Sequence, residues 1–162
     1  MKKIVAIVLV VLCIGAFLCA CGDGPVKTSV NPGYDDGFAK SYANDYSTDK
    51  DGNIQYQFSK EKYDKFIRDY NDKVRTECAD ILGEKSAQYQ YLSDDGKEYN
   101  VGIIPEHYQE IGEEVAKEQA EAMGQILLKY SQSTEKPVDT IKVTFKNANT
   151  GEVYFSIDCK AK

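Results

Sequence analysis

The chain contains a single histidine, His107, so any mechanism that relies on an imidazole must use this residue. Pro105 lies just before it, and because proline is favoured at the first position of a helix, His107 is expected in a first helical turn. The partial positive charge of a helix N-terminus disfavours the imidazolium and so suits a general base. No HExxH, GxSxG or Walker pattern accompanies it. We therefore predict no catalytic residue, and a small hydrolase that uses His107 is kept as the alternative.

Carboxylates gather in the segment STDKDGNI, residues 47–54, which overlays the first eight positions of an EF-hand loop. Asp49 and Asp51 fall on ligand positions in this overlay. Ser47, however, occupies the first position, where a carboxylate is expected, and Phe58 occupies the twelfth, where a bidentate glutamate is needed. We interpret the segment as a β-turn before a strand, with a calcium or small-ligand site as an alternative. Zinc has too few histidine and thiolate ligands, so no metal or other cofactor is predicted.

The N-terminus begins with two lysines and continues in the apolar run IVAIVLVVLCIGAFL, which ends beside small residues and cysteines. This arrangement is typical of a secretory signal. The tetrad Leu18-Cys19-Ala20-Cys21 resembles the lipobox of bacterial lipoprotein precursors. The resemblance covers residues 1–21 only. It implies cleavage before Cys21 and a diacylglycerol on the sulfur of that cysteine.

Cleavage there would remove residues 1–20 as a signal peptide. The remaining protein would be an extracytoplasmic lipoprotein, attached to the membrane through the lipid on Cys21. An uncleaved transmembrane segment is the other interpretation, because the apolar run is just long enough to cross a bilayer. Both interpretations place the rest of the chain outside the cytoplasmic membrane.

Cys78 and Cys159 are the cysteines that remain once Cys13 and Cys19 leave with the signal and Cys21 carries the lipid. An even number of cysteines in an exported protein favours a disulfide. Helical spacing places Cys78 on an apolar stripe, and alternation places Cys159 on the apolar side of a strand. A bridge that closes about eighty residues would add roughly 4 kcal/mol in the chain-entropy description. We predict a disulfide between them, with two buried free thiols as the alternative.

The chain is acidic, with a formal net charge of −6 that becomes more negative if Lys2 and Lys3 leave with the signal. Nucleic acids and anionic membranes attract basic surfaces, so this charge argues against nucleic acid as a partner. Residues 21–33 contain glycines and prolines without apolar periodicity, and we predict a flexible tether there. Residues 34–162 have the size of a single domain.

Apolar periodicity predicts the elements of this domain, since alternation marks strands and a spacing of three or four marks helices. The expected elements are a short helix within residues 34–46, a strand at 54–58, a helix at 60–82, strands at 87–91 and 99–103, a helix at 105–130, and strands at 141–145 and 153–159. After the short helix, the order is β-α-β-β-α-β-β. Hairpins pair antiparallel, and each strand has one apolar face. We therefore predict a two-layer α+β fold, with a mostly antiparallel sheet and two long helices on one face.

The other face of the sheet is expected to be polar and to include Gln88 and Gln90, with Tyr89 and Tyr91 turned toward the core. The second long helix has an acidic side that is suited to a basic partner or to solvent. Candidate partner-binding residues are Tyr154, Lys142 and Asp158 on the sheet, and Glu110, Glu114 and Glu121 on the helix.

These features together predict a lipid-anchored, non-catalytic envelope protein that binds a protein or peptide partner. An immunity, inhibitor or accessory protein would fit. The hydrolase that uses His107 and the small-ligand or calcium protein remain the alternatives.

Overall fold

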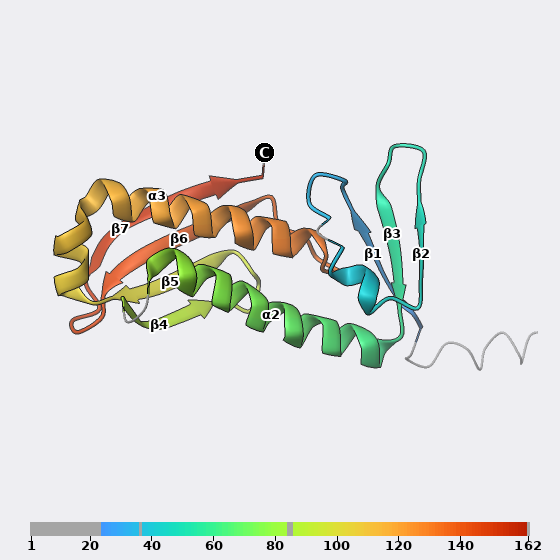
Figure 1. The fold of residues 1–162 in the computed structure, drawn as a ribbon, viewed down its shortest axis with the longest axis horizontal. Coiled ribbons are helices and arrows are strands. Elements are labelled where there is room, and N and C mark those ends of the chain that lie inside the picture. Colours follow the sequence, from blue (N-terminus) through green and yellow to red (C-terminus); the bar gives the residue numbers. More distant parts are fainter. Residues whose placement is uncertain (1–23, 36, 84–85, 162) are drawn as a thin grey trace, which may run out of the picture.

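The computed structural model describes residues 24–35, 37–83 and 86–161. These residues form two sheets and two long helices (Figure 1). The elements in chain order are β1 (Val26–Val30), η1 (Ala39–Ser41), β2 (Asp45–Thr48), β3 (Ile54–Phe58), α2 (Lys60–Leu82), β4 (Ala87–Leu92), β5 (Glu98–Ile103), α3 (Pro105–Gln132), β6 (Thr140–Asn147) and β7 (Val153–Lys160).

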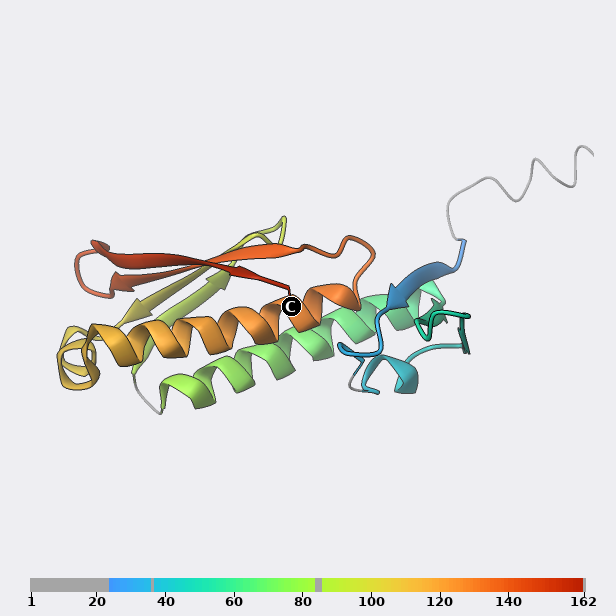
Figure 2. The same ribbon diagram turned by 90° about the horizontal axis from the view of Figure 1, so that it is seen from above.

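The larger sheet has the strand order β4-β5-β6-β7, and both long helices cover the same face of it (Figure 2). The β4–β5 and β6–β7 pairs are antiparallel hairpins. The central β5–β6 pair is parallel, because α3 carries the chain back along the sheet between these strands. The predicted two-layer α+β fold with a mostly antiparallel sheet is therefore confirmed.

The smaller sheet has the order β1-β3-β2, and both of its pairings are antiparallel. The expected strand at Ile54–Phe58 forms, but it belongs to this separate sheet instead of the larger one. The predicted tether over residues 21–33 is wrong for Val26–Val30, which form β1 along the whole length of β3. Val30 is fully buried there. Strand β1 has five residues, and only three of its side chains point inward. This alternation of inward and outward residues is too short to predict a strand from the sequence.

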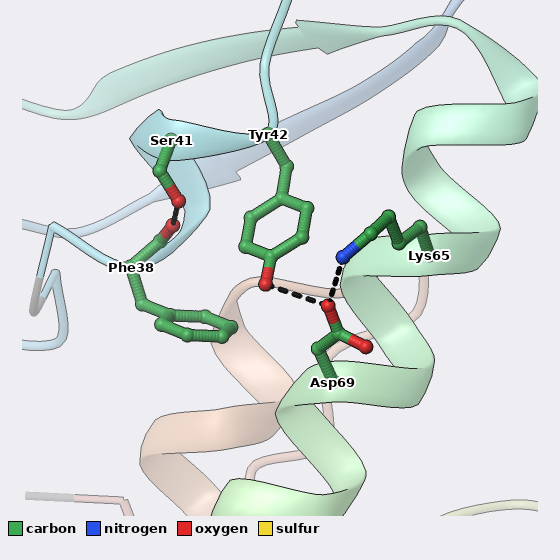
Figure 3. A network of polar contacts seen from close by, with 5 residues as sticks. All are labelled: Phe38, Ser41, Tyr42, Lys65 and Asp69. Carbon is green, nitrogen blue, oxygen red and sulfur yellow. Dashed lines mark hydrogen bonds and ion pairs between the residues drawn. The ribbon is translucent and has the colours of Figure 1, made fainter.

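Between β1 and β3, the expected short helix is reduced to the single turn η1, and β2 follows it. Phe38 and Tyr42 nevertheless point toward α2, as Figure 3 shows. The Tyr42 hydroxyl donates a 2.8 Å hydrogen bond to Asp69, and the Lys65 ammonium also contacts the Asp69 carboxylate. Lys65 and Tyr42 together hold the pKa of Asp69 below its usual value. The segment around η1 is thereby fixed to the first half of α2.

An aromatic cluster joins the smaller sheet to the first half of α2. Its rings lie 5.1–6.1 Å apart between centroids, within the range for favourable aromatic pairs. Tyr130 extends the contact to α3, 4.8 Å from Tyr70. The members of the aromatic cluster are Phe38, Tyr42, Phe58, Tyr63, Phe66 and Tyr70.

Both ends of α2 follow the sequence signals. The Ser59 hydroxyl accepts a hydrogen bond from the Lys62 amide at 3.4 Å, and Gly83 ends the helix with a φ of 86°. The buried side of α2 has the expected spacing of four residues. It consists of Phe66, Tyr70, Val74, Cys78 and Leu82.

In α3, Pro105 occupies the first turn and Gly112 interrupts the helix with a φ of 78°. The part after Gly112 presents Ala116, Ala120 and Gly124 as buried small residues. A Cβ on Gly124 would lie 2.6 Å from the Cβ of Cys159. This glycine therefore lets α3 approach β7 closely.

The predicted disulfide between Cys78 and Cys159 is wrong, because both are buried free thiols. Cys78 lies on α2 and interacts with Tyr99 of β5, whereas Cys159 lies on β7 against α3. Strand β6 separates β5 from β7, and two strand spacings amount to about 10 Å. That separation exceeds the reach of a disulfide. The apolar patterns predicted that both thiols lie in one core. They could not predict that Cys78 lies against β5 whereas Cys159 lies two strands away on β7.

Among the described residues, no helix is both long and apolar enough to cross a membrane. Cys21 and the signal residues 1–20 lie outside the described part of the chain.

Candidate functional site

A large cleft opens beside the larger sheet at the end where β4 turns into β5. Its volume is about 1050 Å³. It is lined by the middle of α2, the last turns of α3, the loop from α3 to β6, and the β4–β5 hairpin with its turn. Clefts of this size are able to bury most of a small ligand or several residues of a peptide.

The floor of the cleft is apolar. Val74 of α2, Tyr99 of β5 and Leu127 of α3 are buried at its base. Ile67 and Val138 are half-buried on its walls. Apolar surface of this kind gains free energy when a ligand removes it from water.

Tyr99 is the main polar group at the base. Its hydroxyl donates a hydrogen bond to the Oε1 atom of Gln90. Burial, together with the neighbouring Cys78, raises the pKa of Tyr99. Burial also raises the pKa of the Cys78 thiol to about 11. Both groups are therefore neutral at pH 7, and the thiol is a packing group instead of an activated nucleophile.

The rim of the cleft is charged. Arg75, Lys97 and Lys136 line it and are exposed, and none of them forms an ion pair with another described residue. Asp94 and Asp95 lie on the β4–β5 turn at the same rim. The Asp95 carboxylate accepts hydrogen bonds from the Ser93 hydroxyl and the Lys97 amide, which keep its pKa low. The cleft thus has an apolar base, with unpaired cations and hydrogen-bonded carboxylates around it. Binding sites for other molecules commonly have this division between an apolar centre and a polar rim.

Two of the candidate residues on the sheet, Lys142 and Asp158, are exposed on its outer face, away from the helices. Lys142 of β6 faces Asp158 of β7 in the strand register. Tyr154 is only partly exposed, because its ring stacks on Tyr108 at 3.9 Å with an interplanar angle of 3°. The prediction that Tyr154 shares the outer face with Lys142 and Asp158 is wrong, because Tyr154 lies at the register shift of β7 and packs on α3.

The candidate residues on α3, namely Glu110, Glu114 and Glu121, are all exposed. They lie on α3 in the helical layer, whereas Lys142 and Asp158 lie on β6 and β7 in the sheet layer (Figure 2). The two predicted groups therefore do not form one site, and neither group lines the cleft.

Strand β4 has its two faces reversed relative to the sequence prediction. Tyr89 and Tyr91 are exposed, whereas Gln90 points to the cleft. A register shift between Ala87 and Tyr89 turns the strand. Gly102 of β5 provides the space, since a Cβ there would overlap the ring of Tyr89.

His107 lies at the opposite end of β5 from the cleft. The cleft surrounds the turn that precedes β5, whereas α3 and His107 follow the last residue of that strand. Six residues of β5 separate the two places, which is roughly 20 Å. The buried Nε2 atom of His107 has no hydrogen-bond partner among the described residues.

The segment around Asp49 is a hydrogen-bonded turn. Oδ1 of Asp49 accepts from the amides of Asp51 and Asn53 at 2.9 Å, and Oδ2 accepts from the Asn53 side chain at 3.0 Å. Both carboxylate oxygens are thus engaged in the turn. In the described part of the chain, no group of three or more histidine, cysteine or carboxylate side chains is arranged to hold a metal ion.

The sequence prediction missed the cleft, whose residues come from segments far apart in the chain. The apolar spacing in the two long helices predicts that their apolar residues lie in the core. It does not predict that a cleft stays open beside three of them, Ile67, Val74 and Leu127. No family model, curated protein or solved structure matches this chain.

Proposed function

We propose that this protein is a lipid-anchored, non-catalytic protein of the cell envelope that binds a protein or peptide partner in the cleft. The cleft carries this proposal, because it combines a large volume with an apolar floor and an unpaired charged rim. Partner-binding sites commonly have this division between an apolar centre and a polar edge.

The neutral state of the buried polar groups supports binding over catalysis. Tyr99 and Cys78 both have raised pKa values. Neither is activated by a neighbouring base, as a nucleophile would need to be. His107, the residue on which the alternative hydrolase depends, is not among the residues that line the cleft.

The lipid attachment at Cys21 rests on the tetrad Leu18-Cys19-Ala20-Cys21. With this attachment, the position of β1 determines how close the folded part lies to the membrane. Val26 is five residues after Cys21, and a fully extended chain of that length spans at most about 18 Å. The smaller sheet would therefore lie near the lipid head groups instead of at the end of a long tether.

Site-specific photocrosslinking in bacteria that express the full chain tests the binding surface. A benzoylphenylalanine residue would replace Asn71 in the cleft, Lys142 on the outer sheet face, or Glu114 on α3, each in a separate variant. We expect a covalent adduct with a second protein from position 71 and none from the other two positions. Adducts from 142 or 114 alone would reject the cleft as the site, and no adduct from any position would reject partner binding.

Metabolic labelling with an alkyne analogue of palmitate tests the anchor. The wild-type chain should carry the label, and Cys21→Ser should lose it. Cys78→Ser is the matched control and should keep the label, because Cys78 is buried in the folded domain. Equal labelling of wild type and Cys21→Ser would reject the lipid anchor.

A further inference from the structure

Strand β4 forms one border of the larger sheet, and the cleft opens beside it. It pairs with β5 on one side, and no described strand pairs with its other side. In Figure 1 it is the lower border of the larger sheet. Strand β7 is the opposite border, and among the described residues it likewise has a single strand neighbour. Only the edge of β4 lies beside the cleft, because residues of β4 line the cleft and residues of β7 do not.

The backbone groups of Gln90 and Leu92 point away from β5. The Ser93 amide donates a 2.8 Å hydrogen bond to the Glu98 carbonyl, so position 93 faces β5. The register is regular from Tyr89 to Leu92, and the direction of the backbone groups alternates along a strand. The amides and carbonyls of Gln90 and Leu92 therefore face the free edge. None of these backbone groups forms a hydrogen bond with another described residue.

A groove follows this edge along α2. The cleft lies beside Gln90 and Leu92, and a smaller hollow of about 150 Å³ continues past Gln90 toward the start of β4. Ala79 and Leu82 of α2 line the smaller hollow, and Val74 of α2 lines the cleft. The free backbone groups therefore border a groove with an apolar wall. Extended peptides bind sheet edges, where main-chain hydrogen bonds provide affinity and pockets for alternate side chains provide specificity.

The lining of the cleft is positive, although the chain as a whole has a formal net charge of −6. It contains three cations, Arg75, Lys97 and Lys136, and two carboxylates, Asp94 and Asp95. The Asp95 carboxylate is already hydrogen-bonded within the β4–β5 turn, whereas the three cations have no ion pair with a described residue. Charge complementarity therefore favours an occupant that carries carboxylates.

We propose that the partner binds the cleft as an extended acidic segment that adds a strand to the free edge of β4. This proposal rests on the proposed function, because it takes the cleft as the partner-binding site. The added strand would form hydrogen bonds with the backbone groups of Gln90 and Leu92. Its residues opposite these two positions point to the helical side, since paired residues of neighbouring strands share a face. We expect apolar residues there, beside Val74, and acidic residues beside Lys97 on the turn after β4.

Photocrosslinking on the two sides of β4 tests strand addition in bacteria that express the full chain. Benzoylphenylalanine would replace Asn71 in the cleft, or Tyr89 on the outer face, which is exposed and does not line the cleft. A strand on the edge of β4 contacts both sides, so both positions should give an adduct with the same protein. An adduct from position 71 without one from position 89 would overturn strand addition and leave the cleft as the binding site. No adduct from either position would overturn the proposed function as well.

Proline substitution tests the backbone hydrogen bonds. Leu92→Pro removes an amide that faces the free edge of β4, and proline is tolerated at such edge positions. Lys160→Pro is the matched control, because Lys160 ends β7 as Leu92 ends β4, and its carbonyl accepts from the Gln125 side chain at 3.3 Å instead of facing β6. With benzoylphenylalanine at Asn71, the adduct should fall about tenfold for Leu92→Pro and persist for Lys160→Pro. Equal yields from the two variants would overturn the strand pairing, and circular dichroism checks that both fold.

Charge exchange at the rim tests the acidity of the partner with the same crosslinker at Asn71. Lys97→Glu combined with Lys136→Glu should lower the adduct about fivefold, whereas Asp94→Lys should raise it. Both effects should shrink at high salt in isolated membranes, because exposed charges are screened. The opposite pair of changes, or no change in either variant, would overturn the acidic character of the bound segment.

Discussion

The two long helices cover the same face of the larger sheet but meet it in different ways. Helix α3 lies close along β6 and β7, with Ala116, Ala120 and Gly124 turned toward the strands. Helix α2 meets the larger sheet only sparsely. Its large buried residues Phe66 and Tyr70 instead belong to the aromatic cluster with the smaller sheet.

The difference shows that side-chain size determines where the helices pack directly on the strands and where a cleft remains between them. Small residues bring α3 near the strands and leave no space between them. The aromatic rings fix the first half of α2 to the smaller sheet, and the cleft lies between the middle part of α2 and the β4–β5 turn. The same amphipathic pattern therefore builds a core where α3 lies close to the strands, and it lines the cleft along the middle of α2 and the last turns of α3.

Replacing Phe66 in the aromatic cluster should lower the stability of the protein more than the other substitutions below. Phe66→Ala deletes a fully buried ring that contacts Phe38, Tyr42, Phe58, Tyr63 and Tyr70. We expect the free energy of unfolding to fall by about 3–5 kcal/mol, which is usual for a buried phenylalanine. Urea denaturation followed by circular dichroism measures this change.

The neighbouring residue on α2 gives the matched control. Ile67 is half-buried on the cleft wall, so Ile67→Ala removes less buried surface. We expect a loss of about 1 kcal/mol for this variant. Equal losses for the two variants would contradict the view that α2 is held by the aromatic cluster and leaves the cleft open.

The close approach of α3 can be broken at Gly124. Gly124→Val should push α3 away from Cys159 on β7, since even a Cβ would lie 2.6 Å from the Cβ of that cysteine. We expect a loss of about 3 kcal/mol, the upper part of the range for overpacking a core. Thermal unfolding monitored by circular dichroism provides the measurement.

Gly102→Val is the comparison on the outer face of the sheet. The atoms nearest to its new Cβ all belong to the ring of Tyr89, which is exposed and can rotate into solvent. We expect a change of less than about 1 kcal/mol. A loss as large as that of Gly124→Val would mean that the outer face is packed as rigidly as the core.

Alkaline pH should weaken the contact between α2 and β5 through Cys78. Burial raises the pKa of this thiol from 9.0 to about 11. Between these pH values the unfolded chain has lost the proton while the folded chain retains it, so stability falls as the pH rises. The loss from this thiol is on the order of 2 kcal/mol, and Cys78→Ala should show a correspondingly shallower decline from pH 9 to pH 11 in urea titrations. Parallel declines in the two proteins would show that the thiol does not contribute.

Periodicity predicted most of the fold because helices and strands bury one side of a regular pattern. The stripe of α2, its Ser59 cap and its Gly83 end are all recognisable in the sequence. The prediction failed where a strand was short, as in β1, or where an irregular register reversed its faces, as in β4. A shift of one residue exchanges the two faces of a strand, so alternation alone cannot reveal it.

The candidate site was less predictable than the fold. The sequence candidates Lys142 and Asp158 face each other across β6 and β7, as alternation requires, but the register shift in β7 lets Tyr154 pack on α3. The candidates Glu110, Glu114 and Glu121 lie on a helix of the other layer. The cleft depends on the distance between α2 and the sheet. No single segment encodes that distance, because it results from the sizes of residues in several elements.

The sequence by itself determined the α+β class, the two long helices, the acidic surface and the tetrad that ends at Cys21. These properties are local, since each depends on residues that are close together in the chain. The tertiary structure decided that Cys78 and Cys159 remain free, that β1 belongs to a separate small sheet, that β7 has an open edge, and that a cleft lies between α2 and the β4–β5 turn. These properties depend on which strands become neighbours and how closely each helix packs, and long-range packing alone sets both.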